Sequence, residues 1–399
     1  METIIQQDVK VLDQWKNEAE VLSIYAVMQR LSDRRRPQGR RYPLALVLTY
    51  ILVAKAAGET TLQGIAEWIR LRGQWLQEVL PGVRGSFPCP ATYSNVLRAI
   101  DSEELNQALM SLLTRARAQT RKPGEQQHVA LDGKTLRGTQ HHLPEDQKKM
   151  HQVNLYETQT GIVLKEQIVG DKENELSRIQ EFLTQELLKG RIVSADALHT
   201  QRAFCLGTIL AEGEYLLIAK GNHPTLQEDL QLFFTEPPLD CQDWRTDSET
   251  NAGHGRLEQR RLIASTELND FLAKEWYGVQ QVFCLRRRVQ KSLYCTQEWV
   301  YGITSLSPSQ ADPQRLLSLL RGHWAIENRL HWRRDVTLRE DACQVRKGGA
   351  PRVLAVLNSF LLALFDWLSV RNVASQMRLF DAQPFLALSL LIRPLVKEN

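Results

Sequence analysis

The sequence predicts an α/β protein in which helices flank a mixed sheet, a β-rich insertion interrupts the sheet domain, and an all-helical N-terminal domain comes first. Three observations carry this prediction. From about residue 8 to residue 118, apolar residues recur at three- and four-residue spacing, the periodicity of amphipathic helices. After the polar segment 121–127, strand-like and helix-like segments alternate. From Pro224 to about Pro308 the pattern is β-rich, and two strongly helical segments follow.

The composition is that of an ordinary globular protein. The chain has 399 residues, of which 24% are charged and 43% hydrophobic, and this length predicts two or three domains. A net charge of +4 permits a polyanionic partner without requiring one, because the clustering of charge matters more than its sum. The six cysteines form no Cys-x-x-Cys pair and no zinc-type spacing, which indicates buried thiols in a reduced compartment.

No targeting or membrane segment is predicted. The first twenty residues, METIIQQDVKVLDQWKNEAE, lack the basic start and apolar run of a secretion signal, so we expect a cytoplasmic protein with no membrane partner. The two most apolar segments are LALVLTYILVAKAAG and VLAVLNSFLLALFDWLSV. The first is too short to cross a bilayer, and the second contains Asn358, Ser359 and Asp366. Both are expected to be core helices.

Residues 1–120 are expected to form the helical N-terminal domain. Within it, TTLQGIAEWIRLRGQWLQEVLPG and PCPATYSNVLRAID have the length and turn chemistry of helices separated by a loop, as in helix-turn-helix folds. Such helices also occur as plain scaffold, and the pattern leaves both interpretations open. The five arginines between Arg34 and Arg41 favour DNA binding.

The rest of the chain is expected to be one sheet domain with an insertion. Its first part, residues 121–223, is predicted to contain three strands, a helix, a strand, a helix and a strand, at 128–133, 151–158, 161–169, 174–188, 191–198, 200–213 and 214–223. Residues 224–310 are the β-rich insertion, with candidate strands at 260–266, 279–289 and 298–304. Residues 311–399 return to helices, predicted at 312–336 and 351–370.

Two aspartates follow apolar strands in the same way. HVALDGKTLRG places Asp132 at the end of one strand, and IVSADALHT places Asp196 at the end of another. In a sheet with this order of elements, the two strand ends can be neighbours. Close carboxylates repel and raise each other's pKa unless a cation lies between them, so the pair indicates either a divalent metal site or an acid–base couple. An N-cap for the next helix is the simpler alternative for Asp196.

Glu327 is the third candidate acid. It lies in RGHWAIENRLHWRRD, a predicted helix whose spacing places it on one face with His323, His331 and Arg334. An ion pair with Arg334 or Arg321 is the simpler alternative. Together, three acids from two strand ends and a helix supply the few oxygen ligands that Mg²⁺ needs. Two such ions about 4 Å apart would activate a water or a 3′-hydroxyl for in-line attack on phosphorus.

Three motifs carry a resemblance to a known family: LDGKTLRG, SADALHTQ and RGHWAIENRLHWRRDVTLREDACQVRKG. Together they resemble insertion-sequence transposases of the H-repeat-associated type, a branch of the DDE superfamily, and the resemblance runs through nearly the whole chain. It implies a ribonuclease-H-like core whose catalytic, metal-binding triad falls on Asp132, Asp196 and Glu327. It also implies a transposase that cuts the ends of its element and joins the 3′-hydroxyls to target DNA.

The same resemblance implies the cofactor and the partners. The expected cofactor is Mg²⁺, with Mn²⁺ as a substitute. The expected partners are double-stranded DNA, as terminal inverted repeats and target, and a second copy of the chain in a homodimer assembled on DNA. The protein would then be nucleoid-associated when bound. The side chains expected to contact DNA are Lys134, Arg137, Lys220, Asn222, His331 and Arg334.

The last motif departs from the wider superfamily, whose signature on this helix is Tyr, Arg, Glu and Lys. The matching residues here are Leu320, His323, Glu327 and Arg334, so only the glutamate is unchanged. Arg334 keeps a cation for a DNA phosphate, whereas His323 in place of arginine weakens such a role. Residues 286–291, RRRVQK, follow Leu285. They fit either a solvent-exposed strand face or a surface that binds the backbone phosphates of DNA.

Two other functions agree with these residues. One is a nuclease of the same fold that performs no strand transfer. The other is a domesticated DNA-binding protein whose acidic triad has lapsed. The intact triad argues against the second, because a protein without catalysis has no need to keep three acids.

Overall fold

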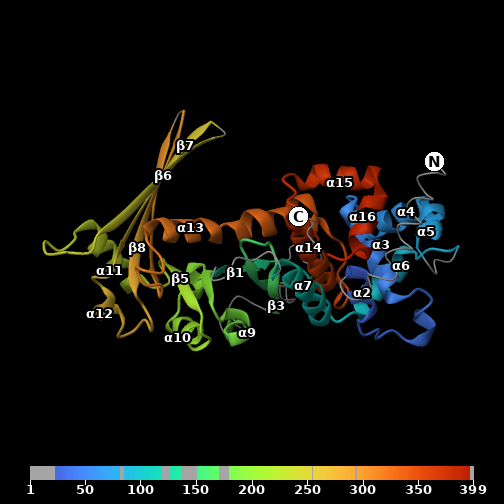
Figure 1. Ribbon diagram of the computed structural model, residues 1–399, viewed down its shortest axis with the longest axis horizontal. Coiled ribbons are helices and arrows are strands. Elements are labelled where there is room, and N and C mark those ends of the chain that lie inside the picture. Colours follow the sequence, from blue (N-terminus) through green and yellow to red (C-terminus); the bar gives the residue numbers. More distant parts are fainter. Residues whose placement is uncertain are drawn as a thin grey trace, which may run out of the picture.

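A computed structural model shows an elongated molecule with a large sheet at one end and a helical bundle at the other (Figure 1). The structure describes residues 23–80, 85–118, 126–135, 151–169, 179–253, 255–292 and 294–395. Helix α13 (Pro313–His323) runs between the two parts, and the hairpin of β6 (Arg245–Gly253) and β7 (Arg256–Ser265) projects from the sheet end (Figure 1).

The described residues form one mixed sheet. Its other strands are β1 (Gln127–Thr135), β2 (His151–Glu157), β3 (Val163–Val169), β4 (Arg191–Ala195), β5 (Glu214–Ala219), β8 (Gln281–Lys291) and β9 (Cys295–Thr304). Their order is β3-β2-β1-β4-β5-β9-β8-β7-β6. Strand β4 pairs in parallel with β1 and β5, and the remaining pairs are antiparallel. The mixed sheet expected from the alternating segments is therefore confirmed.

The β-rich segment extends this sheet. Strand β9 pairs with β5 at Leu217↔Ile303, so β9, β8, β7 and β6 continue it beyond β5. The candidate strand at 298–304 lies within β9, and those at 260–266 and 279–289 overlap β7 and β8 except for one or two residues at an end. The domain boundaries at residues 120, 223 and 310 stay predictions.

Three local expectations were wrong. The segment 174–188 was expected to be one helix, but its described part holds a 3₁₀ turn at Ile179–Phe182 and the short helix α9 (Gln185–Leu188). The segment after Pro224 begins with helix α11 (Pro224–Thr235), in which proline occupies the first turn, where its missing N–H costs nothing. Strand β6 was missed because RTDSETNAG has no apolar alternation, and most of it is exposed.

Helices cover both faces of the sheet. On one face, α9, α10 (Arg202–Leu210), α11 and α12 (Asn269–Leu272) bury a cluster that includes Val129, Leu131, Val193 and Leu217. On the other face, α13 packs Leu316 and Leu320 against Ile192, Leu216 and Phe283. The alternation of these strand residues between the two clusters follows from the two-residue period of a strand.

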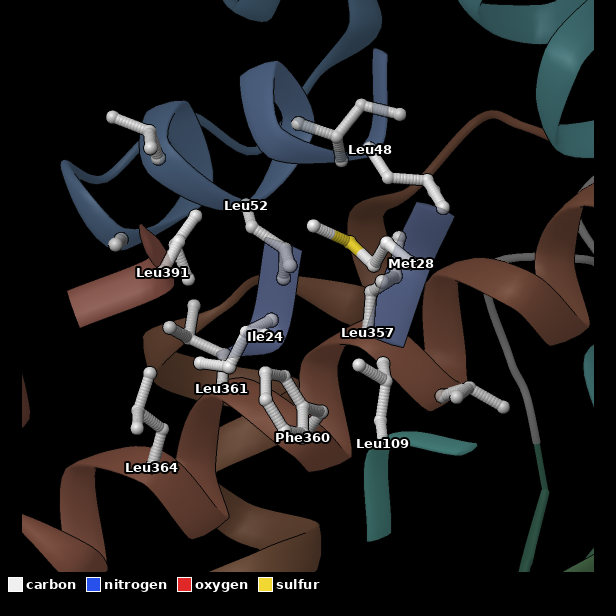
Figure 2. Packing of buried hydrophobic residues seen from close by; sticks show 14 of the residues in the cluster. Ile24, Met28, Leu48, Leu52, Leu109, Leu357, Phe360, Leu361, Leu364 and Leu391 are labelled. Atoms are coloured by element: carbon white, nitrogen blue, oxygen red, sulfur yellow. The ribbon is translucent and has the colours of Figure 1, made fainter. Parts of the chain in front are cut away.

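The helical bundle surrounds one long apolar helix, α14 (Ala350–Trp367). The helices around it are α2 (Ile24–Gln29), α3 (Leu44–Ala56), α4 (Leu62–Leu71), α5 (Gly73–Val79), α6 (Pro90–Ala99), α7 (Ser102–Ala118), α15 (Val373–Ala382) and α16 (Pro384–Ile392). Figure 2 shows side chains of α2, α3, α7 and α16 meeting on α14: Ile24, Met28, Leu48, Leu52, Leu109 and Leu391 around Leu357, Phe360, Leu361 and Leu364. The N-terminal and C-terminal helices thus share one hydrophobic core.

Helix α14 is long and apolar enough to cross a membrane by length and composition alone. However, 89% of it is buried inside the protein. Helix α3, from the other apolar segment, is buried along its whole length. Both segments are core helices, as the sequence predicted.

Because Phe360 is buried where the N-terminal and C-terminal helices meet, we expect Phe360→Ala to lower the free energy of unfolding by about 3–5 kcal/mol. Urea denaturation followed by circular dichroism measures this loss. The control is Leu379→Ala on α15, whose side chain is 40% exposed and whose loss should stay under about 1 kcal/mol. Equal losses in the two variants would contradict a shared core centred on α14.

Candidate active site

Asp132 and Asp196 lie at one level of two adjacent parallel strands. The β1–β4 register pairs Leu131 with Ala195, and the two aspartates directly follow this pair, Asp132 within β1 and Asp196 just after the end of β4. One expectation needs correction, because β1 does not end at Asp132. The strand continues to Thr135 by pairing with β2, and only its pairing with β4 stops. Asp132 therefore lies directly after the last residue of β1 that pairs with β4.

Glu327 comes from the helix that follows α13. Asp312 caps the N-terminus of α13 by accepting a hydrogen bond from Arg315 N at 2.8 Å. Beyond His323 the helix widens into π-helical turns at Ile326–His331 and Arg333–Thr337. Such turns are rare and are frequently found at functional sites. They keep Glu327 and His331 close together, four residues apart.

Asp132, Glu327 and His331 form one cluster. His331 Nδ1 lies 3.5 Å from Asp132 Oδ2 and 3.6 Å from Glu327 Oε2. One ligand atom from each of the three residues lies within 4.8 Å of the others. His331 is 4% exposed, whereas the Glu327 side chain opens to solvent. The cluster thus has a buried inner side and one open side.

Burial and neighbouring charges shift the pKa values of all three groups in the cluster. Burial, together with the nearby Glu327 carboxylate, raises the pKa of Asp132 well above its usual 3.8. The interaction with His331 lowers the pKa of Glu327. Burial lowers the pKa of His331. A raised carboxylate pKa means that the folded protein resists a second negative charge at this point, and a bound cation would remove that resistance.

Asp196 lies beside this cluster rather than inside it. Its side chain is 50% exposed, and its carboxylate accepts a hydrogen bond from Ala197 N at 2.7 Å and lies 3.7 Å from Lys220 Nζ. The capping alternative weighed for Asp196 is therefore present in the structure. The charge of Asp196 nevertheless contributes to the raised pKa of Asp132, which places the two carboxylates within electrostatic range.

Arg334 does not face the cluster. It was expected on the same face as Glu327, seven residues on, because two α-helical turns take about seven residues. Each π turn takes more residues, so seven no longer complete two turns. Arg334 is fully buried, and its guanidinium donates to Glu340 and Gln152, with Nη2 lying 2.8 Å from each. A DNA phosphate cannot reach it, and its role is structural.

The other expected DNA contacts divide into two groups. Lys134 is buried in an ion pair with Asp335, so it is also not free to bind phosphate. Lys220 and Asn222 are exposed after β5, and Asn222 donates to Ala197 O beside Asp196. Arg137 lies outside the described residues.

Ion pairs to α14 hold the helix that carries Glu327. Arg329 Nη2 and Arg333 Nη1 each lie 2.9 Å from a carboxylate oxygen of Asp366. Together with Arg334 and Glu340, these contacts fix the π-helical segment on the side away from the cluster. The helical bundle therefore supports the position of Glu327.

A buried polar chain beneath the site was not found from the sequence. Ser194 Oγ lies 2.7 Å from His128 Nε2 and 2.9 Å from His323 Nδ1, which joins β4, β1 and α13. Burial lowers the pKa of both histidines, so both are neutral at physiological pH. A Cβ on Gly322 would lie 2.8 Å from His128 Nδ1, so the glycine permits this close approach. In the sequence, the glycine directly before His323, in RGHW, was the signal that could have indicated this close packing.

Since removal of one partner leaves a buried charge unpaired, we expect Arg334→Ala to lower the free energy of unfolding by about 3–5 kcal/mol. Denaturant titration of purified protein measures it. The matched control is Arg321→Ala on α13, which removes an exposed pair with Glu249 and should cost under about 1 kcal/mol. A stable Arg334→Ala protein with weakened DNA binding would instead restore the phosphate-binding role.

A second prediction concerns pH. Below about pH 4, Asp132 is protonated in both the folded and unfolded states and contributes no pH dependence. As the pH rises, the unfolded state loses this proton first, so the stability of the metal-free protein falls until the raised folded pKa is passed. Asp132→Asn should therefore raise the thermal midpoint of metal-free protein by several degrees at pH 7.5 and by little near pH 4. Calorimetry across this range would contradict the assignment if the variant were less stable at pH 7.5.

Comparison with known proteins identifies the family. Residues 123–364 match the family described as "Transposase DDE domain", and residues 25–113 match the one described as "DDE_Tnp_1-associated". A protein of Escherichia coli O157:H7 named "Putative transposase YncI" is 27% identical over 334 residues, covering 82% of this chain and 84% of its own. "H repeat-associated putative transposase YhhI" of Escherichia coli K12 is 28% identical over 57% of this chain and 61% of its own.

Among solved structures, a piggyBac transposase synaptic complex with hairpin DNA aligns with 97% of this chain and 80% of its own, at 12% identity and a TM-score of 0.38. The DDE model alone spans residues 123–364, more than half of this chain, and contains Asp132, Asp196 and Glu327. The chain belongs to the DDE transposase family.

Proposed function

We propose that this transposase cleaves the ends of its own insertion sequence and joins the freed 3′-hydroxyls to target DNA by metal-dependent phosphoryl transfer. The catalytic and metal-binding residues are Asp132, Asp196 and Glu327, on a ribonuclease-H-like core. The observation that carries the proposal is the convergence of these acids. Two lie at the same level of adjacent parallel strands, and the third approaches Asp132 from a π-helical turn.

The acids suit a divalent ion. Asp132 is mostly buried beside Glu327, and burial, together with the Glu327 charge, raises its pKa. Carboxylate oxygens are the donors that Mg²⁺ prefers, and Mn²⁺ accepts the same donors. Mg²⁺ is therefore the proposed cofactor, with Mn²⁺ as its substitute. When bound, divalent ions supply Lewis-acid stabilisation of the charge that develops on the attacking and leaving oxygens.

The protein's own groups bind and orient the DNA. The open side of the cluster lies at Glu327, and Lys220 and Asn222 are exposed on the neighbouring β5 side next to Asp196. An exposed ammonium and amide at this position suit contacts with phosphate oxygens next to the scissile bond. Lys220 is now paired with Asp196, so a DNA phosphate and an ion would share these two charges in the complex.

The projecting strands offer a basic face for the DNA backbone. Register places Arg261 of β7, Arg286 and Arg288 of β8 and Trp299 of β9 on one face. No carboxylate in the described part of the chain forms an ion pair with any of these three arginines. Arg286 lies over the half-exposed Trp299 ring. Three guanidinium groups that form no ion pair with a described carboxylate suit a polyanion whatever its sequence.

The opposite face of the same strands is different. There Glu258 pairs with Arg260 and Arg287, and Arg321 of α13 pairs with Glu249. The charged side chains of this face are neutralised by ion pairs within the protein, so few of them can bind DNA phosphates. The contrast between the two faces supports a backbone contact on the face of Arg286 rather than on both.

Recognition of the terminal inverted repeats remains assigned to the N-terminal helices, and the homodimer on DNA remains a prediction. The arginine cluster is partly occupied, because Arg34 pairs with Asp101, whereas Arg35 and Arg40 pair with Asp33. Arg36 is exposed. Fewer arginine side chains are therefore available for end recognition by these helices than the sequence indicated.

The direct test uses a labelled element end, Mg²⁺ and a target plasmid. Asp132→Asn, Asp196→Asn and Glu327→Gln should each abolish cleavage and joining while leaving end binding largely intact, because amides cannot neutralise the ions. Gel separation of cleaved and joined products measures both steps, and a mobility shift measures binding. The matched control, Glu228→Gln on the surface of α11, should cleave and join like the wild type.

Different outcomes separate the rival functions. Wild-type activity in one of the three variants would remove that residue from the triad. Cleaved ends without joined product would support the nuclease without strand transfer. Specific end binding without cleavage by the wild type would support the DNA-binding descendant.

A further inference from the structure

His331 was expected to contact DNA, but the structure gives its ring a different position. The imidazole is buried, and Nδ1 points between the carboxylates of Asp132 and Glu327. A side chain that is 4% exposed and already faces two acids is poorly placed to meet a DNA backbone. It lies on the inner side of the cluster, opposite the open side at Glu327.

The distances are those of atoms that can share one ion. Two donors bound to an ion at about 2.1 Å can be at most about 4.2 Å apart. His331 Nδ1 lies 3.5 Å from Asp132 Oδ2 and 3.6 Å from Glu327 Oε2, inside that limit for both acids. Asp196 is absent from this group of mutually close donor atoms.

The other ring nitrogen has a partner suited to orient it. Asn154 faces Asp132 across the β1–β2 pair, is fully buried, and places its amide 3.4 Å from His331 Nε2. As placed, Asn154 Nδ2 faces the ring, while its buried Oδ1 has no hydrogen-bond partner among the described residues. Rotating the amide by half a turn presents Oδ1 to Nε2–H and leaves the Nδ1 lone pair facing the acids. A metal-bound histidine commonly donates its second N–H to such an oxygen.

We propose that His331 Nδ1 is a direct ligand of the divalent ion held by Asp132 and Glu327, with Asn154 as its positioning residue. This inference rests on the proposed metal site. Imidazole nitrogen suits transition-metal ions, whereas Mg²⁺ prefers oxygen donors and keeps its water. The mixed donor set therefore gives the site a preference for Mn²⁺ over Mg²⁺.

The test is made on the full-length protein without DNA, so that it does not depend on catalysis. Electron spin echo spectroscopy of the Mn²⁺-loaded wild type should show coupling to a directly bound nitrogen, and ¹⁵N-histidine labelling should change that coupling. In His331→Asn, which replaces the ring nitrogen by an amide oxygen, the coupling should vanish. Calorimetric titration should show Mn²⁺ affinity lowered at least about tenfold and Mg²⁺ affinity changed less than about threefold.

Two further variants complete the experiment. His223→Ala, a partly buried histidine at the start of α11, should keep both the nitrogen coupling and the Mn²⁺ affinity. Asn154→Leu should keep the protein folded by circular dichroism but weaken Mn²⁺ more than Mg²⁺. His331→Ala is less suitable, because it leaves a cavity under two acids.

The outcomes separate this inference from the proposed function. Mn²⁺ binding that is lost in Asp132→Asn but shows no nitrogen coupling would overturn the role of His331 and leave the acidic metal site intact. An unchanged ratio of Mn²⁺ to Mg²⁺ affinity in His331→Asn would also overturn it. Failure of the wild type to bind either ion would overturn both the ligand assignment and the metal site of the proposed function.

Discussion

The close approach of the Asp132 and Glu327 carboxylates is the constraint on which the arrangement of this protein depends. Burial of Asp132, together with the nearby Glu327 charge, raises the pKa of Asp132, so the protein resists two negative charges at this point. The fold holds them together with attractive contacts elsewhere. Arg329 and Arg333 bind Asp366 on α14, and Arg334 binds Glu340 in the core. A divalent ion bound between the acids would remove this electrostatic repulsion, which the ion pairs of the three arginines counteract in the metal-free protein.

This constraint links parts of the chain that are far apart in sequence. Asp132 comes from β1, whereas Glu327 comes from a helix nearly two hundred residues later, after the whole β-rich segment. That helix is held by α14, and α14 is enclosed by the N-terminal helices (Figure 2). Removing residues 1–120 would therefore expose Leu357 and Phe360 and disturb the support of Glu327. Recognition of DNA by the N-terminal helices is better tested by surface substitutions than by truncation.

The sequence predicted well the features that depend on the local periodicity of apolar residues. It predicted poorly the features that depend on contacts between residues far apart in the chain. Strands β2, β3 and β5 have clear apolar patterns, and the aspartates fall on adjacent strands as expected. Arg334 was misplaced because the pattern assumed α-helical turns, and nothing in the sequence marks a π-helical turn. Lys134 has the sequence context of a phosphate ligand, but its partner Asp335 lies 201 residues away. The chain of His128, Ser194 and His323 joins three elements, so no single segment could reveal it.

We propose that Asp132, Asp196 and Glu327 together hold divalent ions. Diffraction from crystals of the protein soaked in Mn²⁺, recorded at a wavelength where manganese scatters anomalously, tests it most directly. We expect an anomalous peak between the carboxylates of Asp132 and Glu327, and a second peak on the side of Asp196 once DNA is bound. An anomalous map with manganese elsewhere on the protein and none at Asp132 would contradict it.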